Sequence, residues 1–295
     1  MKYTDITFKE FTKIYMQNLP GKFIYFETPV QIYKVEDLVS YSIATPTPLL
    51  KADFNYIIFL TDGRFEQQVG SEIKKVLPKQ ALLVMQGEVS SLIRHSKKIK
   101  GFYIVFEDQV LQQFKEPGFF IKLFTTAPII TLTQIDNDFV NNISKLIIQE
   151  LETTKPDELI VLHLFQSLLL KLLKSSEIKK GLSRQFDIAV AFRKLVYKHY
   201  LEHYSIKDYS NQLNISPNYL NRCIQSIWNK SAKEFTQEVA IVQSQKFLQD
   251  SAKSISDVAY HLNFSDPSYF GRLFKKIIGS SPQAYRLKLM HDLSE

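Results

Sequence analysis

The spacing of apolar residues changes near residue 108, from short strand-like runs to a helical period. Between residues 23 and about 106, runs such as 56–60, 81–85 and 102–106 are rich in β-branched and aromatic residues. Turn-forming residues separate these runs, as at Asp62-Gly63. Many short strands with turn residues between them predict an antiparallel sandwich or barrel. The runs do not show which face of each strand points inward.

Two helices are predicted after the strands. Apolar residues recur at helical spacing within residues 136–152, and a second helix spans residues 157–174 after a break at Lys155-Pro156. This second helix is apolar on nearly all sides, so it needs cover on more than one face. The cover is either its own domain, or the barrel together with a second subunit. His163, within it, is predicted to be a satisfied core or interface histidine.

A polar segment follows the second helix. Residues 175–184 contain Gly181 and have the composition of a linker. We therefore expect an N-terminal domain over residues 1–178, a linker over residues 179–186 and a helical domain over residues 187–295.

The helical domain contains an internal repeat. Residues 206–216 align with residues 255–265, and after one inserted residue the register continues from Tyr219, which aligns with Tyr269. Each copy reads as helix, tight turn, helix. The sequence thus predicts two helix-turn-helix subdomains, over about residues 193–235 and 250–288.

The helix starts of the two copies share their chemistry. Ser205 and Ser254 each precede an Asp by three residues, which resembles a capping box. The second helices begin at Ser216-Pro217 and Asp266-Pro267, where an N-cap residue precedes a Pro whose missing N–H costs nothing. Matching turn chemistry in both copies favours a true duplication.

Polar side chains remain on the outward face of the second helix in each copy. In a DNA major groove, Arg can bond bidentately to guanine, and Asn or Gln to adenine. Lys and helix N-termini suit phosphates. Gly271 offers no side chain, so we expect Arg272 to carry more of the second half-site. The candidate DNA-binding residues are Asn218, Asn221, Arg222 and Gln225 in the first copy, and Ser268, Gly271, Arg272 and Lys275 in the second.

The second copy resembles the C-terminal signature of the AraC family of bacterial transcriptional regulators. The resemblance rests on YFGRLFKK at residues 269–276 and GSSPQAYR at residues 279–286, and it covers about residues 187–288. The first copy departs from this pattern, because Asn229 stands where the second copy has Gly279. Asn can replace Gly in a left-handed helix cap.

This resemblance implies two helix-turn-helix subdomains joined by a long helix over about residues 232–249. Both recognition helices would enter successive major-groove segments of double-stranded DNA, about 34 Å apart. It also implies a cupin-like sensor domain for a small-molecule effector, with candidate pocket walls on strands 56–60, 81–85 and 102–106, and a homodimer formed through helices 136–174. The expected fold class is α+β with two domains: an N-terminal antiparallel cupin-like β-barrel with dimerisation helices, and a C-terminal all-α double helix-turn-helix.

Composition and charge restrict the possible partners and the cellular compartment of the protein. The net charge of +7 permits nucleic acid as a partner without establishing it, because the basic excess is mild in both parts of the chain. The single cysteine, Cys223, excludes an intrachain disulfide and suits a reducing compartment. The N-terminus lacks the apolar region of a secretory signal, and no apolar run reaches membrane-spanning length. We expect a cytoplasmic protein with no membrane association.

Enzyme and metal chemistry have little support in the sequence. A cupin metal site needs a His-x-His with a nearby Glu and a distant His, whereas residues 1–130 contain His95 alone. No P-loop, nucleophile-elbow or dinucleotide motif occurs, so no enzyme activity, cofactor or metal is expected. Cys223 aligns with Leu273 and is expected to be a buried thiol.

We therefore predict a sequence-specific DNA-binding transcriptional regulator that responds to a small-molecule effector. Three alternatives remain: a regulator without an effector whose barrel is only a dimerisation platform, a cupin enzyme fused to a DNA-binding domain, and a helical adaptor that binds protein.

Overall fold

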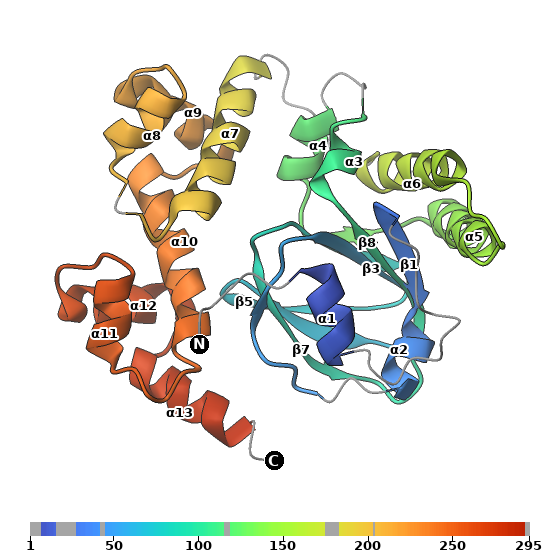
Figure 1. Ribbon diagram of the computed structural model, residues 1–295, viewed down its shortest axis with the longest axis horizontal. Coiled ribbons are helices and arrows are strands. Elements are labelled where there is room, and N and C mark those ends of the chain that lie inside the picture. The colour runs from blue at the N-terminus through green and yellow to red at the C-terminus, as the bar shows by residue number, and fades with distance from the viewer. Residues whose placement is uncertain are drawn as a thin grey trace. The chain divides into compact units, whose positions relative to one another are not determined.

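The computed structural model describes residues 7–15, 28–41, 45–114, 119–174, 183–202 and 204–292. The chain divides into two compact units, residues 2–177 and residues 178–295 (Figure 1). Among the described residues, no helix is long and apolar enough to cross a membrane.

The strands of the N-terminal unit form two antiparallel sheets, and Tyr56 of one sheet donates a hydrogen bond to Ser90 of the other. The predicted barrel thus takes the form of two facing sheets, and the predicted α+β fold class is confirmed. The first sheet contains, in spatial order, β1 (Val30–Lys34), β8 (Lys100–Phe106), β3 (Asn55–Asp62), β6 (Gln80–Val84) and β9 (Ile129–Thr131). The second contains β2 (Leu50–Lys51), β7 (Val89–His95), β4 (Phe65–Val69) and β5 (Glu72–Val76).

The five-stranded sheet is buried on both faces, which explains the uninterrupted apolar runs in its strands. Successive side chains of a strand point to opposite faces. Ile57 and Phe59 of β3 join the core that includes the helices, whereas Tyr56 of β3 and Tyr103 of β8 join the core beneath the second sheet. The structure thus shows which side chains of these strands face each core, a point that the sequence pattern left open.

Helices cover the N-terminal unit, and two of them agree closely with the sequence prediction. The observed helices are α1 (Phe8–Tyr15), α2 (Val35–Tyr41), α3 (Asp108–Leu111), α4 (Phe119–Thr125), α5 (Gln134–Leu151) and α6 (Glu158–Leu173). Helices α5 and α6 correspond to the predicted helices 136–152 and 157–174. Helix α2 is a correction, since it lies within the stretch predicted as strands: Val35 and Leu38 are buried while Glu36 and Asp37 occupy its first turn.

Helix α6 takes most of its cover from its own unit. Phe165 is fully buried, and its ring lies 4.8 Å from that of Phe106. The exception is the first turn, where Leu159 and Ile160 are exposed. His163 is also exposed, with Nδ1 2.7 Å from the carbonyl oxygen of Leu159. His163 therefore does not lie in the core, because it is on the outward stripe of this helix, and its place at an interface stays a prediction.

The C-terminal unit is entirely helical in its described residues. It contains α7 (Ser183–His199), α8 (Ile206–Gln212), α9 (Pro217–Trp228), α10 (Ala232–Phe247), α11 (Ile255–His261), α12 (Pro267–Ile278) and α13 (Pro282–Asp292). Helix α10 lies between the α8–α9 pair and the α11–α12 pair (Figure 1). The segment predicted as a linker, residues 179–186, overlaps the start of α7, and residues 175–182 lie outside the described residues.

Each helix pair has its own apolar core. Leu220 and Ile224 of α9 pack with Phe192 and Tyr209 in the first subdomain. In the second, Phe270 and Phe274 of α12 are fully buried. Cys223 is buried beside Leu220, as its alignment with Leu273 predicts, and burial raises the pKa of its thiol. An inert thiol follows from this environment.

Candidate DNA-binding site

Capping boxes fix the start of the first helix in each subdomain. The Ser205 N–H donates to the Asp208 carboxylate at 2.7 Å, and the Ser205 hydroxyl accepts from the Asp208 N–H. Ser254 and Asp257 repeat this arrangement. The hydrogen bonds from serine lower the pKa of both carboxyls. The predicted capping boxes are confirmed, with Asp in place of the more usual Glu.

The second helices begin and end as the duplicated pattern predicts. Ser216 accepts a hydrogen bond from the Tyr219 N–H, and Asp266 accepts from the N–H groups of Ser268 and Tyr269. The C-caps of α9 and α12 are both left-handed, with φ of 54° at Asn229 and 88° at Gly279. Asn229 thus forms the left-handed helix cap that Gly279 forms in the second copy.

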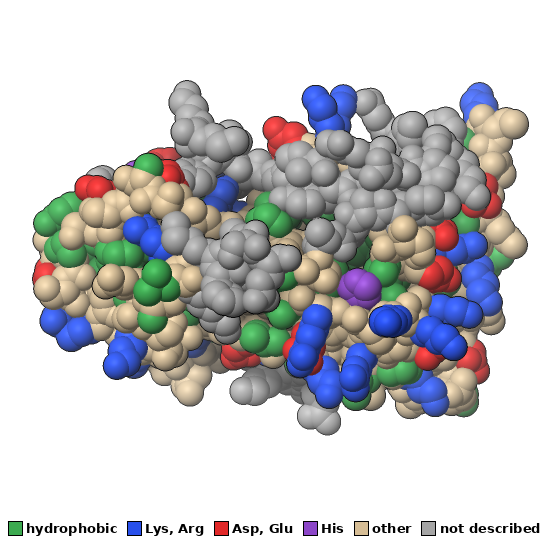
Figure 2. All heavy atoms as spheres, turned by 90° about the horizontal axis from the view of Figure 1, so that it is seen from below, with side chains coloured by type: hydrophobic (Ala, Val, Ile, Leu, Met, Phe, Trp, Pro, Cys, Tyr) green, Lys and Arg blue, Asp and Glu red, His purple; other side chains and the backbone are tan. Residues whose placement is uncertain are grey.

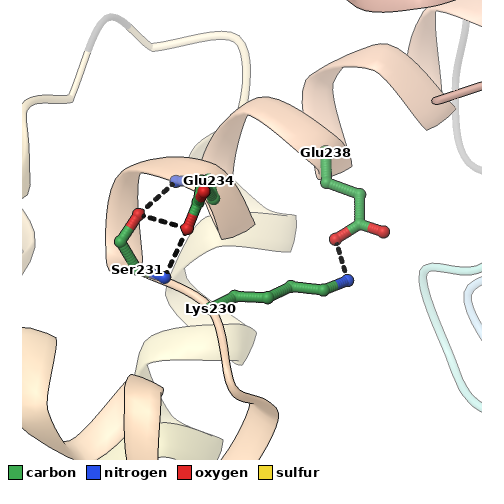
Figure 3. Close-up of polar contacts among 4 residues, drawn as sticks. All are labelled: Lys230, Ser231, Glu234 and Glu238. Atoms are coloured by element: carbon green, nitrogen blue, oxygen red, sulfur yellow. Dashed lines mark hydrogen bonds and ion pairs between the residues drawn. The ribbon is translucent and has the colours of Figure 1, made fainter. Parts of the chain in front are cut away.

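Helix α10 connects the two subdomains, and its start is held from two sides (Figure 3). Ser231 and Glu234 form a third capping box, with the Ser231 N–H donating to Glu234 at 2.8 Å. Lys230, in the turn before α10, pairs with Glu238 one turn further along the helix. These contacts join the end of the first recognition helix to the connecting helix.

The predicted DNA-binding residues occupy one face on each second helix. The spacing of the four on α9 is i, i+3, i+4 and i+7, which places them on one side of a helix. The same spacing recurs on α12. Seven of the eight are exposed and Gly271 is half-buried: Asn218, Asn221, Arg222 and Gln225 on α9, and Ser268, Gly271, Arg272 and Lys275 on α12.

The two arginines have equivalent surroundings with one electrostatic difference. The Arg222 guanidinium lies 5.4 Å from the ring centre of Tyr219, and that of Arg272 lies 6.0 Å from Tyr269. A tyrosine one turn earlier therefore supports each guanidinium through a cation–π contact. Arg272 also lies 3.7 Å from the Asp266 carboxylate, whereas the N-cap of α9 is a serine. This pair is largely solvent-exposed and so contributes little to stability.

Two of the candidate side chains on α9 make contacts within the domain. The Asn221 Oδ1 accepts a hydrogen bond of 2.9 Å from the N–H of Ala232, the first residue of α10. The Gln225 Nε2 donates to Asn229 at 3.2 Å. A bidentate amide contact to adenine needs both the oxygen and the nitrogen. With its oxygen engaged, Asn221 is left with only its amide N–H groups to present outward.

Surface charge does not by itself mark a nucleic-acid face. On the face shown in Figure 2, Lys and Arg side chains stand beside Asp and Glu side chains and among neutral ones. This mixture agrees with the small basic excess of the sequence.

A cavity of about 100 Å³ lies between the two sheets of the N-terminal unit. Its wall comes from β3, β4, β7 and β8, with α1 and α2 beside it. Of the runs predicted as pocket walls, 56–60 and 102–106 contribute, but no residue of 81–85 is among the described lining residues. The Tyr56 hydroxyl donates to Ser90 at 2.7 Å and accepts from Gln67 at 3.2 Å. In the described part of the chain, no group of three or more His, Cys, Asp and Glu side chains could hold a metal.

Comparisons with known proteins identify a helix-turn-helix domain in the C-terminal unit. The family described as a helix-turn-helix domain matches residues 209–288. The uncharacterised HTH-type transcriptional regulator YisR of Bacillus subtilis is 31% identical over 124 residues, which is 42% of each chain. The chain thus spans about two fifths of that relative's length. The HTH-type transcriptional activator RhaR of Mannheimia succiniciproducens is 20% identical over 83% of this chain and 89% of its own. The crystal structure of ToxT from Vibrio cholerae matches with a TM-score of 0.44, at 12% identity over 88% of this chain and 96% of its own.

The paired helix-turn-helix units, each with a polar recognition face, define the C-terminal unit as a DNA-binding domain. The domain is of the AraC type, and the resemblance to the AraC family is confirmed.

Proposed function

We propose that this protein is a sequence-specific DNA-binding transcriptional regulator that responds to a small molecule bound in its N-terminal unit. The observation that carries the proposal is the duplication of one solvent-exposed polar helix face, on α9 and again on α12. The relatives are named as transcriptional regulators, which supports binding and not catalysis as the output. In this proposal, residues 1–178 sense and dimerise, 179–186 connect, and 187–295 bind DNA.

Each recognition helix reads one major-groove segment. Arg222 and Arg272 bond to guanine edges, with Asn218 and Ser268 beside them near the helix N-termini. The N-terminal N–H groups of α9 and α12, together with Lys275, contact phosphates and set the register. Arg272 leaves Asp266 when it enters the groove, because a base edge and the carboxylate compete for the same guanidinium.

Effector response requires that the small molecule bind two conformational states of the protein with different affinities. The cavity between the sheets supports this role, because it carries a few polar groups within a mainly apolar wall. A barrel that served only as a dimerisation platform would have a filled core at this position.

Homodimer formation through α5 and α6 is part of the proposal. Ile135, Phe139 and Leu146 are exposed along one face of α5, and Leu159 and Ile160 extend this apolar surface onto α6. An antiparallel second copy that crosses near Asn142 brings Phe139 toward Leu146 of that copy and Asp138 toward its Lys145. In this crossing the charges of the face are complementary to those of the second copy.

The experiment that tests DNA recognition is selection of bound sequences from random duplex DNA at physiological salt. Wild type, Arg222→Ala and Arg272→Ala are compared, because each arginine lies on a different recognition helix and serves as the control for the other. We expect wild type to enrich two sequence blocks about one helical turn, 34 Å, apart. Arg222→Ala should relax one block and Arg272→Ala the other, each by roughly tenfold in discrimination.

Two results would contradict the proposal. If wild type enriches no sequence with or without candidate effectors, the helical unit does not read DNA. If both variants keep wild-type enrichment, the polar faces serve another partner, and the adaptor alternative is favoured.

A further inference from the structure

The cavity of the N-terminal unit has a wall whose chemistry restricts what can bind there. Most of the wall is aromatic or aliphatic, with Phe54 and Phe65 among the buried rings that surround it. All described lining residues are apolar or uncharged polar residues, apart from the imidazole of His95. A charged ligand would lose its hydration on entering this cavity. The described lining residues offer no opposite charge to compensate for that loss.

The polar groups in the wall form one cluster that joins the two sheets. Gln67 of β4 and Tyr103 of β8 are 5% and 7% exposed, so both are almost removed from solvent. The Gln67 Nε2 donates to Tyr56, while its Oε1 accepts no hydrogen bond from the described residues. The Tyr103 hydroxyl likewise has no hydrogen-bond partner among the described residues, although it lines the cavity.

Buried polar groups of this kind ordinarily have partners. Burial raises the pKa of the Tyr103 hydroxyl, so that group remains a donor at neutral pH. The cavity thus offers an acceptor, the Gln67 carbonyl oxygen, and a donor, the Tyr103 O–H, in a mainly apolar wall that also contains Thr47, Ser90, Ser91 and His95. A ligand hydroxyl can donate to the one and accept from the other, and an amide likewise carries both a donor and an acceptor.

The size of the cavity limits the rest of the ligand. A volume of about 100 Å³ is of the order of the engineered cavities of about 150 Å³ that hold benzene. One six-membered ring with a short substituent fits this space.

We propose that the effector is a small uncharged molecule with a single ring and one hydroxyl or amide group, which pairs with Gln67 and Tyr103. This inference rests on the proposed function, since it assigns the ligand class of the effector site. It makes the regulator a sensor of neutral ring compounds, and not of carboxylates or amines.

The test uses four probes of nearly equal size on the full chain: benzyl alcohol, toluene, benzoate and benzylamine. Saturation-transfer NMR titrations give a dissociation constant for each. Benzyl alcohol should bind tightest, with toluene about fivefold weaker because it lacks the hydroxyl. Benzoate and benzylamine should each be weaker by more than about tenfold, since they carry a charge into the wall.

Variants identify the groups responsible. Gln67→Leu and Tyr103→Phe should each weaken benzyl alcohol about fivefold and leave toluene unchanged. Gln68→Leu is the matched control, because Gln68 is the next residue of β4, is not among the lining residues, and donates to the Gly70 carbonyl instead. It should bind all four probes as wild type does.

Several outcomes would overturn the proposal: a charged probe that binds as tightly as benzyl alcohol, equal effects of Gln67→Leu and Gln68→Leu, or no binding of any probe. Failure of the proposed function has a different signature, since wild type would then bind benzyl alcohol but enrich no DNA sequence. Binding of the probe together with a probe-dependent change in DNA affinity supports both.

Discussion

At the scale of single residues, corresponding positions of the two recognition helices have different roles. Asn221 of α9 accepts a hydrogen bond from the first N–H of α10, so it holds the helix that connects the subdomains. Its counterpart on α12 is Gly271, where an added Cβ would have no neighbour within 4 Å. An added methyl group at position 271 thus meets no other atom of the protein, and we propose that the glycine there allows close approach of DNA.

The Gly271→Ala substitution should change protein stability and DNA affinity in opposite directions. Glycine in a helix interior is less favourable than alanine by about 1 kcal/mol, and nothing in the protein opposes the new methyl group. We expect the variant to be more stable by about that amount in urea denaturation. Its affinity for the selected DNA sequence should fall, because the methyl group then projects into the helix–DNA contact.

Gly279→Ala is the control for this prediction. Gly279 has φ of 88° at the C-cap of α12, where alanine is strained although space is open. This variant should lose stability by about 1 kcal/mol. The interpretation of Gly271 fails if Gly271→Ala is stabilised while its DNA affinity matches that of wild type.

Residue-level features could be predicted where they depend on local chain order, and not where they join distant segments. The caps at Ser205, Ser216 and Asn229 follow from neighbouring residues, and the structure has them. The contact of Asn221 with α10 depends on how a turn folds back. The Tyr56–Gln67–Ser90 cluster joins three strands whose alignment no local pattern encodes.

At the scale of elements, the spacing of apolar residues predicted where strands and helices lie in the sequence better than which way their side chains face. The strands at 56–60 and 102–106 are present within β3 and β8, yet both faces of their sheet are buried. An apolar run without alternation cannot distinguish the face that meets α5 and α6 from the face that meets the cavity. Helix α2 escaped prediction because it has only seven residues and follows β1 directly.

The capping boxes predict a pH dependence for the C-terminal unit. Hydrogen bonds from Ser205, Ser231 and Ser254 lower the pKa values of Asp208, Glu234 and Asp257. A carboxyl whose pKa is lower in the folded state contributes stability above its unfolded pKa and loses it as pH falls through the folded value. Urea midpoints of this unit should therefore decrease as the pH is lowered from about 5 to about 3.

The control is the double variant Asp208→Asn and Asp257→Asn, whose amides do not titrate. At neutral pH it should be less stable than wild type, because the charge-assisted caps are weakened. At about pH 3 the two proteins should converge, since the wild-type carboxyls are then protonated. Parallel pH profiles for the two proteins would show that these caps do not set the acid sensitivity.

At the scale of the whole molecule, the proposed dimer depends on the outward face of α5. Its inward face is occupied, since Val140 and Ile147 are fully buried in the N-terminal core. The outward residues Ile135 and Leu146 are 78% and 45% exposed, whereas the Phe139 ring is partly covered by Lys171 of α6, whose Nζ lies 4.9 Å from the ring centre. A second copy is the partner whose charges match, because an antiparallel crossing brings Asp138 near Lys145 of that copy.

A charge reversal tests both the dimer and its orientation. Asp138→Lys and Lys145→Asp each place like charges across the crossing, and should raise the dimer dissociation constant by about fivefold in sedimentation equilibrium. The double variant restores opposite charges at both ends of the two-fold crossing and should return to the wild-type constant. Lys97→Asp, which reverses an exposed charge in the β7–β8 turn, should leave the constant unchanged. Additive weakening in the double variant would contradict the antiparallel crossing, and a wild-type protein that remains monomeric would contradict the dimer.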